Sequence, residues 1–152
     1  MDRVVTEVLV FEVEGQRHGL PVAQVRELLP AMQVTPLPAA PHGIEGVVNL
    51  RGTIVPVVAV RKLFGVPPRP LMPSDHFIVA CLQDQMIVLH VDRAMELAQL
   101  ETNAIALEST AAPRVAKSAS GLVVLHDVHH FLSAKSAELL LNSPPSVKEM
   151  QP

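Results

Sequence analysis

The sequence predicts an all-β protein, mainly strands with short helices, arranged as two small barrels packed together. Most of the chain consists of short runs rich in β-branched residues that are separated by Gly and Pro, which is the pattern of strands and turns. A long helical pattern occurs only near the C-terminus, so the regular alternation of strands and helices that indicates a parallel α/β sheet is missing. The composition, with 49% hydrophobic and 18% charged residues, indicates a folded chain rather than a disordered one.

The first thirty residues predict two strands and a helix. Leu9–Val13 places apolar residues on one face, as a half-buried strand does, and Gly15 turns it towards a second strand that ends near Leu20. Apolar residues then recur at helical spacing, namely Val22, Val25, Leu28 and Leu29. Pro21 suits the first turn of a helix and Pro30 stops one, so we expect a helix between these prolines.

The strongest strand signal is a hairpin with a single cation at its tip. Gly46–Leu50 and Thr53–Val60 are rich in β-branched residues and flank Arg51-Gly52, where Gly52 can take the positive φ of a tight turn. Pro56 in the second arm indicates an edge position or a bulge. Arg51 should point into water or towards a partner, and a guanidinium suits partner contacts because it is planar, weakly hydrated and rich in donors. From the residues alone, a purely solubilising role for Arg51 stays open.

The middle of the chain predicts a division into two halves. Segment 66–74 contains four prolines and is the best candidate for a linker. After it, His76–Leu82 and Met86–Val91 predict a second hairpin, while Ala94–Leu97 and Leu122–Leu125 predict further strands. The sequence contains no convincing internal repeat, so we expect the two halves to share a shape without sharing residues.

The C-terminal part predicts a capped helix and a tail. Asp127 can accept the free N–H groups of a first helical turn. One apolar stripe follows it, made of Val128, Phe131, Leu132, Leu139 and Leu140. Residues 142–152 are polar and contain Pro, so we expect a disordered tail. His126 and His130 lie four residues apart and could share a metal, which leaves a small metal-dependent enzyme open as an alternative, although a solvated helix start explains them more simply.

Charge, cysteine content and motifs exclude several classes of protein. The net charge is −3 and no basic cluster exceeds Arg61-Lys62, which argues against nucleic-acid binding. Cys81 is the one cysteine, so the chain has no internal disulfide. We find no nucleophile elbow, phosphate loop or dinucleotide fingerprint, and we expect no catalytic residue, metal or cofactor. The start lacks the pattern of a signal peptide and no apolar run is long enough to span a membrane, so we expect a soluble, cytoplasmic protein without membrane insertion.

The stretch from Pro38 to Gly65, PAAPHGIEGVVNLRGTIVPVVAVRKLFG, resembles the signature of the CheW family, a proline followed by G-V-[VI]-N-L-R-G-x-[IV]-[VI]-P-[VI]. Weaker similarity extends from about Val8 to Leu132. The resemblance implies a single CheW-like domain over residues 6–141. Its fold would be two packed five-stranded barrels resembling Src-homology-3 domains, with a shared core and a C-terminal helix.

The resemblance also implies a function without catalysis. Members of this family are adaptors that couple the cytoplasmic tips of transmembrane methyl-accepting chemoreceptors to the regulatory domain of a CheA-type histidine kinase. The partners implied are therefore a receptor tip and that kinase domain, with other CheW-like domains as further candidates. The location implied is the cytoplasm, with recruitment to the inner membrane through receptor arrays. A stand-alone CheA-type regulatory domain would share the fold and is a further alternative.

The resemblance assigns roles to residues of the hairpin. The arginine of the motif is associated with receptor binding, and this role falls on Arg51. The receptor groove of the family lies between the barrels and is lined by apolar residues, for which we expect Val47, Val48 and Ile54. Three further residues are expected to shape the turn, namely Gly46, Asn49 and Gly52. Two positions depart from the family pattern: Ala59 replaces an acidic residue, and His126 replaces an apolar residue at the end of the last strand.

Overall fold

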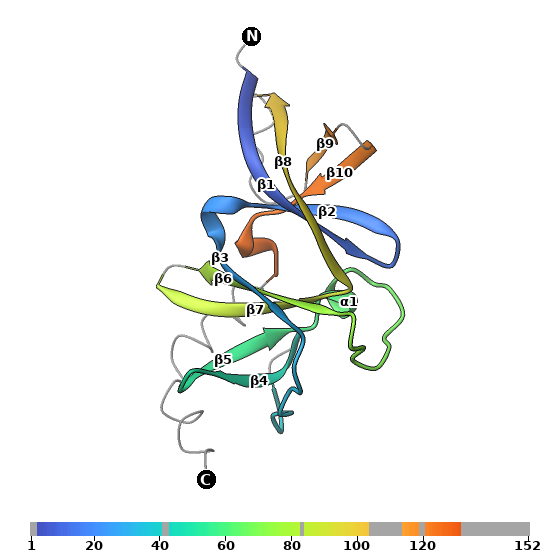
Figure 1. Ribbon diagram of the computed structural model, residues 1–152. Coiled ribbons are helices and arrows are strands. Elements are labelled where there is room, and N and C mark those ends of the chain that lie inside the picture. The colour runs from blue at the N-terminus through green and yellow to red at the C-terminus, as the bar shows by residue number, and fades with distance from the viewer. Residues whose placement is uncertain (1–2, 41–42, 83, 104–113, 119–120, 132–152) are drawn as a thin grey trace.

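The computed structural model describes residues 3–40, 43–82, 84–103, 114–118 and 121–131, and these form two five-stranded sheets with little helix (Figure 1). Sheet A, at the top of Figure 1, has the strand order β8-β1-β2-β10-β9, with bounds β1 Arg3–Val13, β2 Gln16–Pro21, β8 Arg93–Asn103, β9 Arg114–Ser118 and β10 Gly121–Leu125. Sheet B, below it, has the order β3-β6-β7-β5-β4, with bounds β3 Val25–Pro30, β4 Ile44–Leu50, β5 Thr53–Val58, β6 His76–Leu82 and β7 Gln85–Val91. The predicted all-β class with two five-stranded units is confirmed.

The path of the chain differs from the one expected. The chain forms β1 and β2, crosses to sheet B through the short 3-10 turn η1 (Val22–Gln24), completes all five strands there, and returns to sheet A through Asp92 alone. Segment 66–74 therefore lies between helix α1 (Val60–Leu63) and β6, inside sheet B, and the prediction of a linker there was wrong. Prolines mark an irregular segment, but they do not say which elements that segment joins.

The helix predicted between Pro21 and Pro30 was also wrong. Only η1 is helical there, and the rest is strand β3, which pairs antiparallel with β6. The pairing gives β3 partners for its backbone groups and packs Leu29 against the interior of sheet B. The apolar spacing resembled that of a helix because Val22 belongs to η1 and because β3 carries an exposed leucine, Leu28, directly before the inward-facing Leu29.

Apolar side chains form three cores because each sheet has two buried faces. The interior of sheet A contains Val8, Val10, Leu100, Ala116, Val123 and Leu125. The interior of sheet B contains Val48, Leu50, Val55, Val57, Phe77, Val79 and Val88. The third core lies between the sheets and takes residues from both, namely Leu9, Phe11, Val13, Leu20, Ile44, Val58, Val60, Ile78, Ala80, Ile87, Leu89, Val91, Val128 and Phe131. The expected shared core is therefore present.

Each sheet also curls so that its end strands approach each other. In sheet A the end strands β8 and β9 are in contact. In sheet B the segment after β3 crosses the free edge of β4, where Thr35 and Val47 exchange two backbone hydrogen bonds, each of 2.9 Å. Gly46 lies directly beneath this crossing, and a Cβ atom on it would come within 2.3 Å of the Thr35 carbonyl oxygen. Gly46 thus permits a close backbone contact, a role distinct from the turn-shaping one expected for it.

The described part of the chain ends in a short 3-10 helix. Asp127 caps the 3-10 turn η3 (Val128–Phe131), since its Oδ1 accepts the backbone N–H of His129 at 3.0 Å, as predicted. The remainder of the predicted helix and the predicted tail, residues 132–152, lie outside the described residues. Among the helices that the structure describes, none is long and apolar enough to cross a membrane.

Candidate functional site

The tip of the β4–β5 hairpin presents Arg51 from a tight turn. Arg51 and Gly52 have φ values of 51° and 89°, and positive values at both central residues are those of a type I′ hairpin turn. The Asn49 side chain supports the turn, because its Oδ1 accepts the Gly52 backbone N–H at 2.7 Å. The structure therefore places Gly52 in the turn and Asn49 near the end of β4, from where its side chain holds the turn. The Arg51 side chain projects from the hairpin and is 73% exposed.

Arg51 is also held in one direction by a residue from another strand. Its guanidinium makes a two-pronged contact with Glu27 of β3, in which Nη1 donates to Oε1 at 3.0 Å and Nη2 pairs with Oε2. The contact lowers the pKa of Glu27 and raises that of Arg51, in each case chiefly through the shared hydrogen bonds. Because β3 and β4 are the end strands of sheet B, the pair joins its two edges. Glu27 had not been predicted, because its segment was expected to be helical.

The apolar residues expected beside Arg51 lie on different faces of the hairpin. Val48 points into the interior core of sheet B and is 3% exposed. Val47 pairs with Pro56 and is 8% exposed, beneath the crossing of Thr35. Ile54 pairs with Asn49 and is partly exposed. In the free chain, Val47 and Val48 therefore contribute to packing, and Ile54 is the one of the three with substantial surface available to a partner.

Two exposed leucines flank the core between the sheets. Leu97 of β8 is 61% exposed and lies opposite Leu9, while Leu28 of β3 is 45% exposed and lies opposite Ile78. Leu9 and Ile78 both belong to the shared core, so one exposed leucine borders it from each sheet. Sequence reasoning could not find them, because a leucine in a strand is normally a core residue. We call Leu28 and Leu97 the apolar rim.

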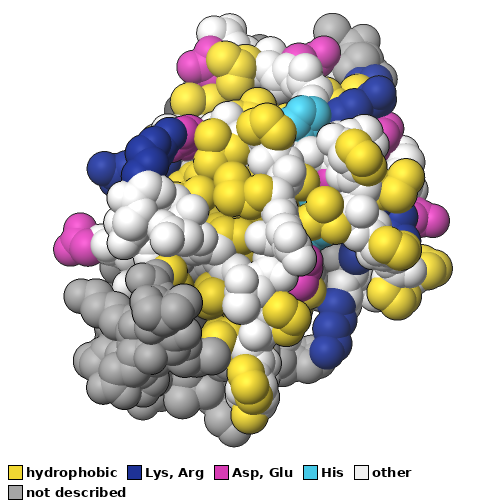
Figure 2. Space-filling view, turned by 60° about the horizontal axis from the view of Figure 1, so that its bottom comes forward, with side chains coloured by type: hydrophobic (Ala, Val, Ile, Leu, Met, Phe, Trp, Pro, Cys, Tyr) yellow, Lys and Arg dark blue, Asp and Glu magenta, His cyan; other side chains and the backbone are white. Residues whose placement is uncertain are grey.

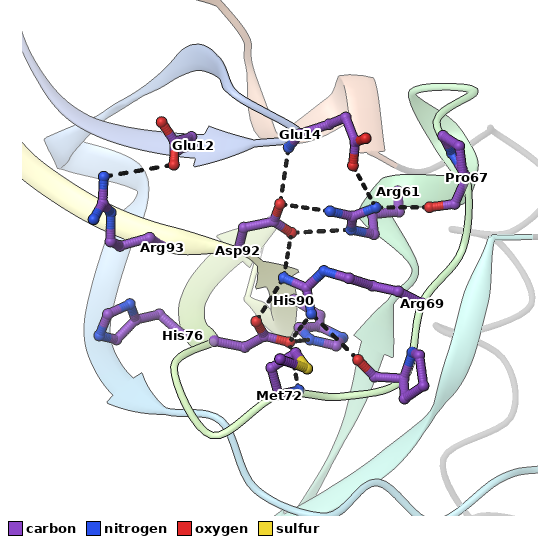
Figure 3. Close-up of polar contacts among 12 residues, drawn as sticks. Glu12, Glu14, Arg61, Pro67, Arg69, Met72, His76, His90, Asp92 and Arg93 are labelled. Atoms are coloured by element: carbon purple, nitrogen blue, oxygen red, sulfur yellow. Dashed lines mark hydrogen bonds and ion pairs between the residues drawn. The ribbon is translucent and has the colours of Figure 1, made fainter.

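Charged side chains from both sheets meet at the point where β7 ends and β8 begins (Figure 3). Arg61 of α1 donates from Nε to Asp92 Oδ1 at 3.0 Å and from Nη2 to Asp92 Oδ2 at 2.6 Å. Arg61 Nη1 also pairs with Glu14 Oε1 at 2.8 Å, and Arg69 Nη2 lies 3.1 Å from Asp92 Oδ1. We call these four residues, Glu14, Arg61, Arg69 and Asp92, the inter-sheet cluster. Burial alone would raise the pKa of Asp92, but Arg61 and the Glu14 backbone N–H outweigh it, and the pKa lies below its usual value.

A second group of charges continues from this cluster along a cavity of about 390 Å³. His90 bridges Glu45, 3.0 Å from Nδ1, and Asp75, 2.8 Å from Nε2, while Arg69 pairs with the same Asp75 at 2.8 Å. Burial would lower the pKa of His90, but the two carboxylates raise it above its usual value. Ala59 lines this cavity in place of the acidic residue of the family pattern. The charged groups of the cavity are thus largely paired with one another.

His126, the second departure from the family pattern, is buried in an imidazole pair. Its Nε2 lies 2.9 Å from Nδ1 of His18, and both rings are buried close to Phe64. Desolvation lowers the pKa of His18 to about 4 and that of His126 to about 3. Across the part of the chain that the structure describes, no group of three or more His, Cys, Asp or Glu residues is arranged to hold a metal ion. Within the same described residues, the partner of His126 is therefore the imidazole of His18.

The Lys and Arg side chains do not form one basic patch on the face that Figure 2 shows, where they lie in separate groups around apolar side chains. The fold and the hairpin together define the class of protein: a two-sheet β module of the Src-homology-3-like kind that presents a positioned, exposed arginine.

Comparison with known proteins agrees with this class and identifies the family. The CheW-like domain family matches residues 7–140, and the chain belongs to the CheW family. The chemotaxis protein CheW of Thermotoga maritima is 33% identical over 118 residues, which cover 77% of this chain and 76% of that protein. The chemotaxis protein CheW of Treponema pallidum is 22% identical over 90% of this chain and 87% of that protein. The crystal structure of the scaffolding protein TtCheW from Thermoanaerobacter tengcongensis superposes with a TM-score of 0.74 at 25% identity, covering 88% of this chain and 96% of that one.

Proposed function

We propose that this chain is a non-catalytic adaptor that couples methyl-accepting chemoreceptors to the regulatory domain of a CheA-type histidine kinase, in a chemotaxis or chemotaxis-like pathway. Membership of the CheW family supports the general role. The observation that carries the proposal is the Arg51 guanidinium, which a glycine turn exposes and Glu27 orients. Other CheW-like domains are further candidate partners, and receptor arrays would recruit the protein to the inner membrane.

The proposed receptor surface combines the hairpin tip and the apolar rim. Arg51 reaches β3 at Glu27, the residue next to Leu28. Because neighbouring side chains of a strand point to opposite faces and β3 is an edge strand, the cation and this leucine lie on either side of the same edge. Ile54 adds partly exposed apolar surface on the hairpin. Val47 and Val48 would contribute mainly by supporting the hairpin from beneath. A receptor helix that buries apolar side chains on the rim and offers a carboxylate to Arg51 would match both features.

Coupling of this kind needs binding and geometry alone. One surface holds the receptor and another holds the kinase domain, so that each partner raises the effective concentration of the other. Modest individual affinities are then sufficient for a stable assembly. The binding free energies of linked contacts add together, less the cost of ordering the groups that form them. In this account the chain acts as a rigid spacer.

Replacing Arg51 by glutamate is expected to weaken binding of a chemoreceptor cytoplasmic fragment by about tenfold or more, because a charged hydrogen bond is lost and a repulsive charge replaces it. The thermal stability should change little, since the pair with Glu27 is exposed. Isothermal titration calorimetry with the purified receptor fragment measures the first quantity, and a thermal melt followed by circular dichroism measures the second.

A charge swap provides the matched control. The double variant Glu27→Arg, Arg51→Glu restores an ion pair between the hairpin and β3 but moves the cation from the hairpin tip to the strand. If the guanidinium at the tip contacts the receptor, the swapped protein keeps its stability and stays defective in binding. Recovery of receptor binding in the swapped protein would instead show that the ion pair acts only by holding the hairpin in place.

A further inference from the structure

The inter-sheet cluster lies where the chain crosses from sheet B back to sheet A. Asp92 is the single residue between β7 and β8, and its own N–H donates to the Glu12 carbonyl of β1 at 3.1 Å. Its carboxylate accepts the backbone N–H of Glu14, in the β1–β2 turn of sheet A, at 2.8 Å. The same carboxylate binds Arg61, which belongs to the sheet B side of the molecule. Asp92 is therefore bonded to both sheets at once.

Arg61 makes the reciprocal connection. It extends from α1, which follows β5, and its guanidinium reaches Glu14 of sheet A as well as Asp92 and the Pro67 carbonyl oxygen at 2.7 Å. In Figure 3 the Arg61 guanidinium lies between Glu14, Asp92 and Pro67, with dashed contacts to all three. The side chains of Arg61 and Asp92 are mostly buried. Charge-assisted bonds of this two-pronged kind are directional and are screened less by solvent than an exposed ion pair is.

The shared core does not fix the relative orientation of the two sheets as these hydrogen bonds do. It consists of aliphatic and aromatic side chains, whose burial is favourable roughly in proportion to area and is not directional as a hydrogen bond is. Packed elements can shift against one another by small shear displacements, as packed helices do during domain closure. The chain crosses between the sheets at η1 and at Asp92, so a directional contact at the second crossing limits such sliding.

From these observations we infer that Asp92 and Arg61 are positioning residues that set the angle between sheets A and B, and through it the spacing of Leu28 and Leu97 across the apolar rim. Leu28 belongs to sheet B and Leu97 to sheet A, so any change in the angle alters the surface that they form together. The consequence for receptor binding rests on the proposed function, whereas the effect on the angle does not.

Residual dipolar couplings of the backbone amides test the inference without any partner. In the native protein, the couplings of both sheets should fit one alignment tensor. In Asp92→Asn, which keeps the shape of the side chain but loses its charge, the two sheets should need different tensors, while the couplings within each sheet still fit its own structure. The receptor fragment should then bind about tenfold more weakly, within the usual range of coupling between sites.

Two further variants keep the test decisive. Arg93→Gln removes a neighbouring ion pair between Arg93 and Glu12, 3.5 Å apart and within sheet A, and should change neither the tensors nor the affinity. If Asp92→Asn does not fold, Arg61→Lys keeps the charge but loses the two-pronged contact, and should show the same separation of tensors. A single tensor for both sheets in these variants would overturn the inference. Separate tensors with unchanged receptor affinity would overturn its link to the rim, and a native protein that fails to bind receptor would overturn only the proposed function.

Discussion

Replacing Gly46 by alanine is expected to destabilise the fold by about 3 kcal/mol, the upper part of the usual range for overpacking. A Cβ at this position would lie 2.3 Å from the Thr35 carbonyl oxygen and 2.7 Å from a Val34 methyl group. The oxygen cannot easily move aside, because it accepts the Val47 N–H while the Thr35 N–H donates to the Val47 carbonyl oxygen. Relief of the clash would therefore break the crossing that joins the two edges of sheet B.

Gly19→Ala is the matched control for this prediction. Gly19 is also in a strand without a positive φ, but its added Cβ would meet only side-chain atoms, at 3.1 Å or more, which can adjust. We expect it to cost about 1 kcal/mol, at the low end of the overpacking range. Urea unfolding followed by circular dichroism compares the two variants. Equal stability of Gly46→Ala and the native protein would show that the Thr35 crossing does not form in solution.

Acidification from about pH 7 to about pH 5 is expected to remove about 3 kcal/mol of stability, because of the buried imidazole pair. His18 and His126 have pKa values lowered to about 4 and about 3, so in the folded protein they stay neutral through this window. In the unfolded chain they titrate near 6.5 and take up protons. The unfolded state then binds more protons than the folded state, and the free energy of unfolding falls as the pH falls.

Other titrating groups can be separated from this effect. His90 has a raised pKa, so its contribution is fully present below about pH 6.5 and is lost as the pH rises through its folded pKa, which is the opposite direction. Asp75 and Asp92 have lowered pKa values, and their contributions are lost only as the pH falls below about 4. His126→Leu, which replaces the imidazole with an apolar side chain, should reduce the loss between about pH 7 and about pH 5 by roughly half. Urea unfolding over this pH range measures it, and an unchanged pH dependence in His126→Leu would contradict the account.

Local features of the structure were predictable from the sequence. The β4–β5 hairpin, its Arg51-Gly52 turn and the β6–β7 hairpin follow from β-branched runs around turn residues, because register and turn chemistry act over a few residues. The cap formed by Asp127 was predictable for the same reason, because a capping side chain bonds to a backbone N–H two residues further on. Features of this kind need no knowledge of the rest of the fold.

Features that depend on distant contacts were missed or misread. The β3 segment forms a strand because β6 pairs with it, although its own spacing resembled a helix. The assignment of segment 66–74 as a linker failed because sheet A is completed only after β8 returns to it. His126 suggested a metal ligand by its distance from His130, whereas its bonded partner is His18, far away in the sequence. The partners Glu27 and Asp92 became visible only once the strands were placed.

Sedimentation velocity of the chain mixed with a chemoreceptor tip fragment and a CheA-type regulatory domain tests whether the chain holds both partners at once. We expect one complex that contains all three proteins and does not form when the chain is left out. The double variant Leu28→Asp, Leu97→Asp should lose the receptor fragment but retain the kinase domain. Leu122→Asp, which changes a similarly exposed leucine of β10, should retain both. Mutual displacement of the two partners from the native chain would contradict the proposed coupling role. Binding of the kinase domain without the receptor fragment, as expected of a stand-alone regulatory domain, would contradict it as well.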